Sequence, residues 1–161
     1  MPARIVTQRS PIHGNGVFAA TDIAKGERLI QYRGKLLTHE ESDRMYPDSA
    51  DSGHTFLFVL NDEYVLDANQ NGNSARWINH SCRPNCEAVL VEDENGDRRR
   101  DRVYIESIRK IARGEELTYN YGIVLDVAHT PAMKKIWACR CGSKNCTGTI
   151  LQPKRKKKKA A

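Results

Sequence analysis

Three cysteines near the C-terminal end of the chain have a spacing that suits metal binding. Cys139, Cys141 and Cys146 form a Cys-x-Cys-x4-Cys run within eight residues. A structural zinc ion takes four ligands in a tetrahedron, and thiolates are among its preferred ligands. The run lacks one ligand, which either remaining cysteine, Cys82 or Cys86, can supply. The sequence therefore predicts a structural zinc site that fixes a short segment poor in apolar residues.

A second group of reactive side chains lies between Arg76 and Cys86. Asn79, His80, Ser81 and Cys82 follow one another there. A histidine near a cysteine can act as the base that activates a thiolate nucleophile. Composition alone therefore leaves covalent catalysis by cysteine open.

A glycine-rich run, His13-Gly14-Asn15-Gly16, precedes an expected strand. Glycine carries no side chain, so the backbone amides of such a turn can approach a ligand closely. The same pattern is common in turns that bind nothing. A ligand-binding loop and a plain turn are both compatible with it.

Bulk composition is typical of a single globular domain. The 161 residues are 39% hydrophobic and 29% charged, which suits one domain with its own core. Residues 1–9 contain two basic residues and no long apolar stretch, and no apolar run reaches membrane-spanning length. An odd number of cysteines, five, without an export signal argues against a disulfide framework. We expect a soluble intracellular protein, in the nucleus of a eukaryote or the cytoplasm and nucleoid of a bacterium.

The positive charge is concentrated in one run near the end of the chain. The formal net charge is +6, and the rest of the chain balances with 20 basic and 20 acidic residues. Electrostatic contact with a nucleic acid is therefore expected from this run rather than from the folded body. The run consists of Lys154, Arg155, Lys156, Lys157, Lys158 and Lys159.

Short β-like runs dominate the sequence and predict a mostly β fold. The expected strands cover residues 4–8, 17–20, 28–32, 55–60, 64–66, 88–91, 103–108 and 117–121. Two segments resemble each other, Ile23 to Leu29 and Ile111 to Leu117. Each has a glycine suited to a left-handed turn before a strand.

Local signals also predict two helices and a hairpin. Thr38 with Glu41 three residues later forms a capping box, which predicts a helix to about Met45. A second helix is expected over Pro131 to Trp137. The Asn95-Gly96 pair predicts a hairpin turn, and the arginines that follow it should lie at the solvated tip.

Four motifs, in this order, resemble those of SET-domain protein lysine methyltransferases. They are Arg9 to Phe18, Tyr32-Arg33-Gly34, Arg76 to Asn85 and Glu116 to Tyr121. The cysteine cluster is similar to the zinc-binding post-SET segment of the same family. The first and third motifs most resemble the trithorax and mixed-lineage-leukaemia type, without the cysteine-rich pre-SET region of some relatives.

This resemblance implies a fold and a division of the chain. The fold is mostly β, with small curved sheets, few short helices and a threaded, pseudoknot-like C-terminal segment. A SET domain is expected over residues 4–122, a post-SET segment with the zinc site over 123–151 and a disordered basic tail over 152–161. The resemblance also suggests a free-standing enzyme.

The resemblance further implies roles for particular residues. Tyr121 resembles the catalytic tyrosine, and Tyr119 occupies the position that limits the number of methyl groups added. Phe56 stands where relatives often carry a second active-site tyrosine, which puts the methylation state and the rate in question. Contacts with S-adenosylmethionine are implied for His13, Gly14, Asn15, Gly16, Tyr32, Arg76, Asn79, His80 and Arg140.

The resemblance also selects the fourth zinc ligand. It implies that Cys82 joins Cys139, Cys141 and Cys146, while Cys86 stays free. The implied activity is transfer of a methyl group from S-adenosylmethionine to a lysine of a histone or another basic, DNA-associated protein. The alternatives are a catalytically weak SET module that binds a peptide or nucleic acid, and a zinc-binding nucleic-acid adaptor that uses its basic tail.

Overall fold

The computed structural model describes residues 4–48, 51, 55–123, 125 and 128–152. Its strands are β1 (Ile5–Arg9), β2 (Asn15–Ala19), β3 (Arg28–Tyr32), β4 (Lys35–Thr38), β5 (Leu57–Val59), β6 (Tyr64–Asp67), β7 (Asn79–His80), β8 (Cys86–Val91), β9 (Arg102–Ser107) and β10 (Thr118–Tyr119). Its α-helices are α1 (His39–Met45) and α2 (Pro131–Ile136), and its 3-10 helices include η2 (Ser74–Trp77) and η3 (Arg98–Arg100).

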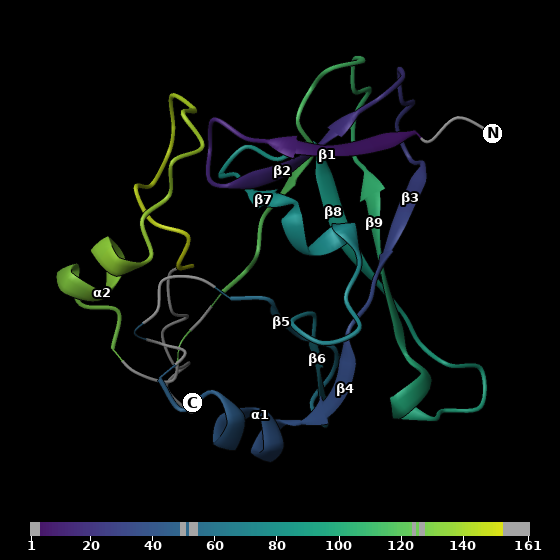
Figure 1. Ribbon diagram of the computed structural model, residues 1–161, viewed down its shortest axis with the longest axis vertical. Helices are drawn as coiled ribbons and strands as arrows, with labels where there is room; N and C mark the ends of the chain where they lie inside the picture. The colour runs from purple at the N-terminus through teal and green to yellow at the C-terminus, as the bar shows by residue number, and fades with distance from the viewer. Residues whose placement is uncertain (1–3, 49–50, 52–54, 124, 126–127, 153–161) are drawn as a thin grey trace, which may run out of the picture.

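The strands of the described residues form small sheets rather than one large sheet. β1 pairs with β2, β3–β9–β8 and β4–β6–β5 are three-stranded antiparallel sheets, and β7 pairs in parallel with β10. Figure 1 shows α1 beside β4, while α2 and the chain after it lie on the opposite side of the molecule from the β8–β9 hairpin. The predicted mostly β fold with few short helices is confirmed.

Several elements follow the expected local signals. The Thr38 hydroxyl accepts a hydrogen bond from the Glu41 amide, and the Glu41 carboxylate accepts one from the Thr38 amide, as a capping box requires. Gly96 has φ +75° at the turn before η3. Strand β4 was not predicted, because its pairing with β6 is a long-range contact that no local pattern reveals.

The two similar segments pair with each other in space. Ile23 and Ile111 form an antiparallel bridge through two backbone hydrogen bonds of 2.8 Å, and both side chains are fully buried. Gly26 and Gly114 follow each isoleucine by three residues with φ of +82° and +87°, a conformation that favours glycine. The pairing of the two similar turns thus brings the chain before β3 and the chain before the fourth motif together in the core.

The segment that leads into β10 lies between elements distant in sequence. Glu116 bridges Phe18 of β2, and the Glu116 carbonyl accepts a hydrogen bond of 2.8 Å from the Asn85 side chain. The amide of Thr118 donates to the same side chain of Asn85 at 2.9 Å. This enclosure by β2 and by the loop after β7 is the arrangement that a threaded C-terminal segment needs, an exception to the usual unthreaded connections.

Two expectations fall on residues with no described structure. The basic run over residues 154–159 lies outside the described residues, as does most of the expected tail over 152–161. Within the described part of the chain, none of the helices has the length and apolar character needed to cross a membrane.

Candidate functional site

A cavity of about 370 Å³ opens where the N-terminal loop, the third motif and the cysteine segment meet. This volume lies within the range of small-molecule sites in proteins. Its walls come from four parts of the chain: residues 12–15, residues 55–56, the stretch that holds Arg76, Trp77, Asn79 and His80, and the C-terminal stretch from Lys135 to Ile150, with Tyr121 beside them. Most residues assigned to the cofactor by resemblance thus meet at one cavity.

Asn79 holds the N-terminal loop in place through its side-chain amide. The Asn79 Nδ2 atom lies 3.1 Å from the carbonyl oxygens of His13 and Asn15 and 2.9 Å from a carboxylate oxygen of Glu116. The loop is also closed by a hydrogen bond of 2.8 Å from the Ser10 amide to the Gly14 carbonyl. The amide group therefore fixes the curvature of the loop that forms one wall of the cavity.

His80 is a neutral, buried imidazole whose ring positions Tyr121. Its Nδ1 accepts a hydrogen bond of 3.0 Å from the Tyr121 amide, so Nε2 carries the proton. Burial lowers the pKa of His80 to about 4. With Nδ1 engaged, His80 is not available as a general base.

Tyr121 brings a phenolic hydroxyl to the cavity. The hydroxyl donates a short hydrogen bond to the carbonyl of Ile78, which leaves its lone pairs free to accept. Burial first, then Tyr32 and the negative charge of Glu116, raise the pKa of Tyr121 well above its usual value. Tyr121 is therefore a neutral phenol at physiological pH, suited to orienting a reacting group rather than to removing a proton.

An aromatic cluster backs Tyr121. The Tyr119 ring centroid lies 4.9 Å from that of Tyr121 and 6.5 Å from that of Phe58. Tyr32 packs on Phe58 at 4.9 Å and donates a hydrogen bond of 3.0 Å to the carbonyl of Phe56. Tyr119 and Tyr32 are buried and contribute to this cluster instead of lining the cavity.

Phe56 and Arg76 lie at the same end of the cavity. The Phe56 ring meets Trp77 edge to face at 5.2 Å, and the Arg76 guanidinium lies 4.7 Å from the Trp77 ring centroid. Arg76 also donates to the Ala68 carbonyl at 3.2 Å. Its Nε is buried and has no hydrogen-bond partner among the described residues. Because Arg76 lines the cavity, its guanidinium gives this end of the cavity a positive charge.

The C-terminal wall was only partly anticipated. Arg140 lines the cavity as the resemblance implied, but Trp137, Ile136, Lys135 and Ile150 line it too. Trp137 is almost fully buried, and its carbonyl accepts hydrogen bonds from the Ile150 amide and the Thr149 hydroxyl. The only sequence signal for these residues was their proximity to the cysteine run.

Gly16, assigned to the cofactor by resemblance, does not line the cavity. A Cβ atom at this position would lie 2.4 Å from a carboxylate oxygen of Glu116 and 2.9 Å from the Ser10 Cβ. Gly16 is therefore needed for close packing behind the loop. Glu116 and Ser10 were not singled out from the sequence, although Glu116 belongs to the fourth motif.

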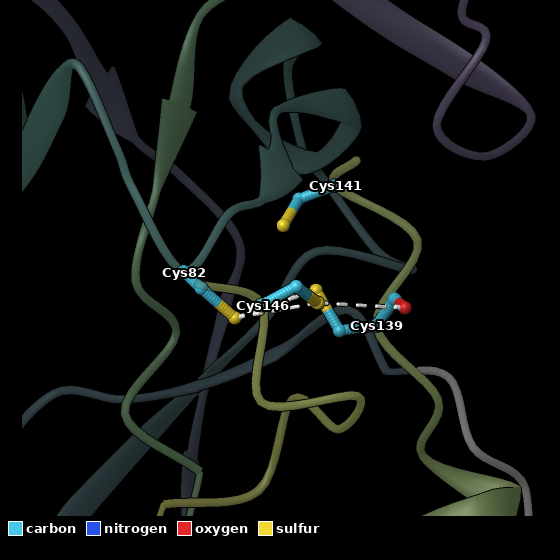
Figure 2. Close-up of side chains that lie close together, drawn as sticks. All are labelled: Cys82, Cys139, Cys141 and Cys146. Carbon is cyan, nitrogen blue, oxygen red and sulfur yellow. Dashed lines mark hydrogen bonds between the residues drawn. The ribbon is translucent and has the colours of Figure 1, made fainter. Parts of the chain in front are cut away.

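Four cysteines converge near the cavity (Figure 2). The sulfur atoms of Cys82, Cys139, Cys141 and Cys146 all lie within 4.8 Å of one another. Cys82 Sγ is 3.7 Å from Cys139 Sγ and 3.9 Å from Cys146 Sγ. A tetrahedron with zinc–sulfur bonds of about 2.3 Å requires sulfur atoms about 3.8 Å apart, so this donor set fits zinc.

Cys86 lies apart from the other cysteines. Its side chain is buried in the core, and burial raises the pKa of the thiol to about 12. A thiol in this state is inert as a nucleophile. Cys82, whose Sγ lies 3.9 Å from His80 Nε2, belongs to the four-sulfur cluster. These placements argue against covalent catalysis by cysteine.

Comparisons with known proteins agree with the fold. The SET domain family model matches residues 14–122, and the chain belongs to this family. Trithorax, a histone-lysine N-methyltransferase of Drosophila virilis, is 40% identical over 140 residues, covering 86% of this chain and 3% of that protein. Human histone-lysine N-methyltransferase 2B is 37% identical over 140 residues, covering 86% of this chain and 5% of that protein.

Two further relatives extend the comparison to fungi. The H3 lysine-4 specific histone-lysine N-methyltransferase of Chaetomium globosum is 36% identical over 145 residues, covering 88% of this chain and 13% of that protein. A crystal structure of the Chaetomium thermophilum polycomb repressive complex 2 superposes with a TM-score of 0.67 and 32% identity over 76% of this chain and 16% of that chain. The chain thus spans only a small part of the length of these relatives.

Proposed function

We propose that the chain is a protein-lysine N-methyltransferase that uses S-adenosylmethionine. The observation that carries this proposal is the meeting of three features at one cavity. These are the backbone loop over residues 12–15, the positive charge of Arg76 and the Tyr121 hydroxyl held by the Ile78 carbonyl. Membership of the SET family supports the same activity.

The residues of the cavity fit this cofactor by their chemistry. Arg76 offers a positive charge for a carboxylate, the loop offers backbone groups, and Trp137 offers an aromatic wall for a nucleobase. His13, Gly14, Asn15, Asn79, His80 and Arg140 complete the proposed contacts. When bound, S-adenosylmethionine supplies an electrophilic methyl group on a positively charged sulfonium.

The protein's own part in the reaction is orientation. A lysine amine with a pKa near 10.4 must lose a proton before it attacks, at a cost of about 4.6 kcal/mol at pH 7. Neither Tyr121 nor His80 is a base here, since one is a neutral phenol and the other has its Nδ1 engaged. The hydroxyl of Tyr121 and the nearby carbonyl of Ile78 instead hold the amine in line, and the apolar surroundings favour its neutral form.

The aromatic residues around Tyr121 set how many methyl groups fit. We propose that Tyr119 limits the space behind the amine, because it is fully packed against Tyr121 and Phe58. Phe56 makes one wall of the cavity apolar where relatives often carry a hydroxyl. The substrate we propose is a lysine of a histone or another basic, DNA-associated protein, with residues 154–159 as an additional contact to DNA.

Zinc in the four-cysteine cluster would be structural. All four positions are filled by thiolates, which leaves no open position for catalysis. Cys139 and Cys141 flank Arg140, and the segment also positions Trp137 and Ile150. We propose that the metal holds this wall of the cavity together, so its role in activity is indirect.

Substitution of the Tyr121 hydroxyl tests the proposal. Tyr121→Phe should lower kcat about 100-fold or more while leaving the Kd for S-adenosylmethionine within about two-fold, because the hydroxyl acts on the reacting groups. Tyr104→Phe, on β9 away from the cavity, is the matched control and should behave as wild type. Equal kcat values for the two variants would contradict the role given to the Tyr121 hydroxyl. Wild type that binds no S-adenosylmethionine by calorimetry would favour a binding module.

A further inference from the structure

Glu116 places a carboxylate directly behind the N-terminal loop of the cavity. Both of its carboxylate oxygens lie 2.8 Å from the Ser10 hydroxyl, and one of them lies 2.9 Å from Asn79 Nδ2. Ser10 in turn accepts a hydrogen bond of 3.0 Å from the Ile12 amide. One carboxylate therefore anchors both sides of the loop that runs from Ser10 to Gly16.

The backbone around Glu116 leaves it little freedom. The residue bridges Phe18 of β2, and its own carbonyl accepts from the Asn85 side chain. The absent side chain of Gly16 creates the space that the carboxylate fills, since a Cβ there would lie 2.4 Å from the oxygen. The position of the carboxylate is thus set by packing on three sides.

The charge of Glu116 contrasts with the charges that line the cavity. Among the described residues, Arg76, Lys135 and Arg140 line it and no aspartate or glutamate does. A site with this lining favours anions, yet the proposed cofactor carries a sulfonium cation that its product, S-adenosylhomocysteine, lacks. The Glu116 carboxylate accepts a hydrogen bond from Asn79, which lines the cavity, and so places a negative charge behind the N-terminal loop.

We propose that Glu116 is a positioning residue that shapes the Ser10–Gly16 loop and whose negative charge makes the site favour the sulfonium cofactor over the neutral thioether product. This inference rests on the proposed function. It adds the reason why a cavity lined by cations accepts a positively charged ligand. The two ligands differ by a methyl group and a charge. The change in their relative affinity when the Glu116 charge is removed therefore reports the effect of that charge.

Calorimetric titration of the zinc-loaded protein with each ligand tests this inference. Glu116→Gln should weaken the binding of S-adenosylmethionine more than the binding of S-adenosylhomocysteine. A unit charge at roughly 10 Å changes a binding constant about two-fold to fifteen-fold for effective dielectric constants of about 80 to 20. Glu115→Gln removes the same charge at the neighbouring residue, whose carboxylate pairs with Arg109 on the surface, and should leave the ratio of the two Kd values unchanged.

A second variant separates shape from charge. Ser10→Ala removes the hydroxyl that bridges the loop to Glu116 but keeps the carboxylate. The Kd values of both ligands should therefore rise by the same factor. A Kd ratio that stays at the wild-type value in Glu116→Gln would overturn the inference, as would unaltered affinities in Ser10→Ala. Wild type that binds neither ligand would instead contradict the proposed function itself.

Discussion

The polar side chains around the cavity are engaged with protein partners before any ligand arrives. Asn79 holds carbonyl groups of the loop, His80 holds the Tyr121 amide and Tyr121 donates to Ile78. Such residues act by position, because each buried group is already satisfied and cannot move without loss of a hydrogen bond. Arg76 differs, since its buried Nε still lacks a partner among the described residues.

Asp67, the last residue of β6, shows the same principle. It is fully buried, and its carboxylate accepts hydrogen bonds from the Tyr46 hydroxyl at 2.7 Å and from Asn69 and Gln70 at 2.9 Å. Burial alone would raise the pKa of Asp67, but these hydrogen bonds outweigh it and hold the pKa below its usual value. The carboxylate therefore stabilises the fold when ionised.

This arrangement predicts a pH-dependent stability. Tyr46→Phe should reduce the free energy of unfolding by about 1 to 2 kcal/mol at pH 7. A lowered carboxyl pKa contributes stability above the unfolded-state value and loses it as the pH falls through the folded-state value. The loss of unfolding free energy in the variant, measured by denaturant unfolding, should therefore become smaller as the pH falls below about 4, the usual pKa of an aspartate. A deficit that is constant with pH would show that Asp67 is not responsible.

Among the helices, strands and turns, those that depend on neighbouring residues could be predicted, and those that depend on long-range pairing could not. The capping box of α1 and the turn at Asn95-Gly96 depend on neighbouring residues alone, so the sequence predicts them. Strand β7 was not predicted, because it has two residues and pairs with the distant β10, whereas β10 lies within the strand expected over residues 117–121. Residues at the end of α2 line the cavity because of how the cysteine segment folds. No periodicity in the sequence from Lys135 to Trp137 identifies these residues as part of the cavity.

The cysteine segment carries an element-scale prediction. Removing zinc with a chelator should abolish binding of S-adenosylmethionine while far-ultraviolet circular dichroism stays close to the loaded protein, because the sheets lie outside the segment. Cys146→Ser should lower the bound zinc measured by metal analysis, whereas Cys86→Ala should retain it. Retention of full zinc by the Cys146 variant, or loss in the Cys86 variant, would contradict the assignment of ligands.

At the scale of the molecule, the cavity depends on segments from the whole length of the chain. The loop over residues 12–15, the stretch from Arg76 to His80 and the wall from Lys135 to Ile150 are brought together by small sheets and by the enclosed segment before β10. The resemblance of the sequence motifs to the SET family predicted that these segments meet. Periodicity alone predicted only a mostly β fold. Distant pairings of this kind are invisible in a single sequence without such motifs.

Methyl transfer to a lysine is the central claim, and a labelled product tests it most directly. The zinc-loaded protein would be incubated with radiolabelled S-adenosylmethionine and a panel of histones and bacterial nucleoid proteins, beside a chain truncated after Pro153. We predict label on the side-chain nitrogen of a lysine, located by mass spectrometry, with the truncation weakening transfer if the basic run tethers the substrate. Label on no protein, or label on a residue other than lysine, would contradict the account.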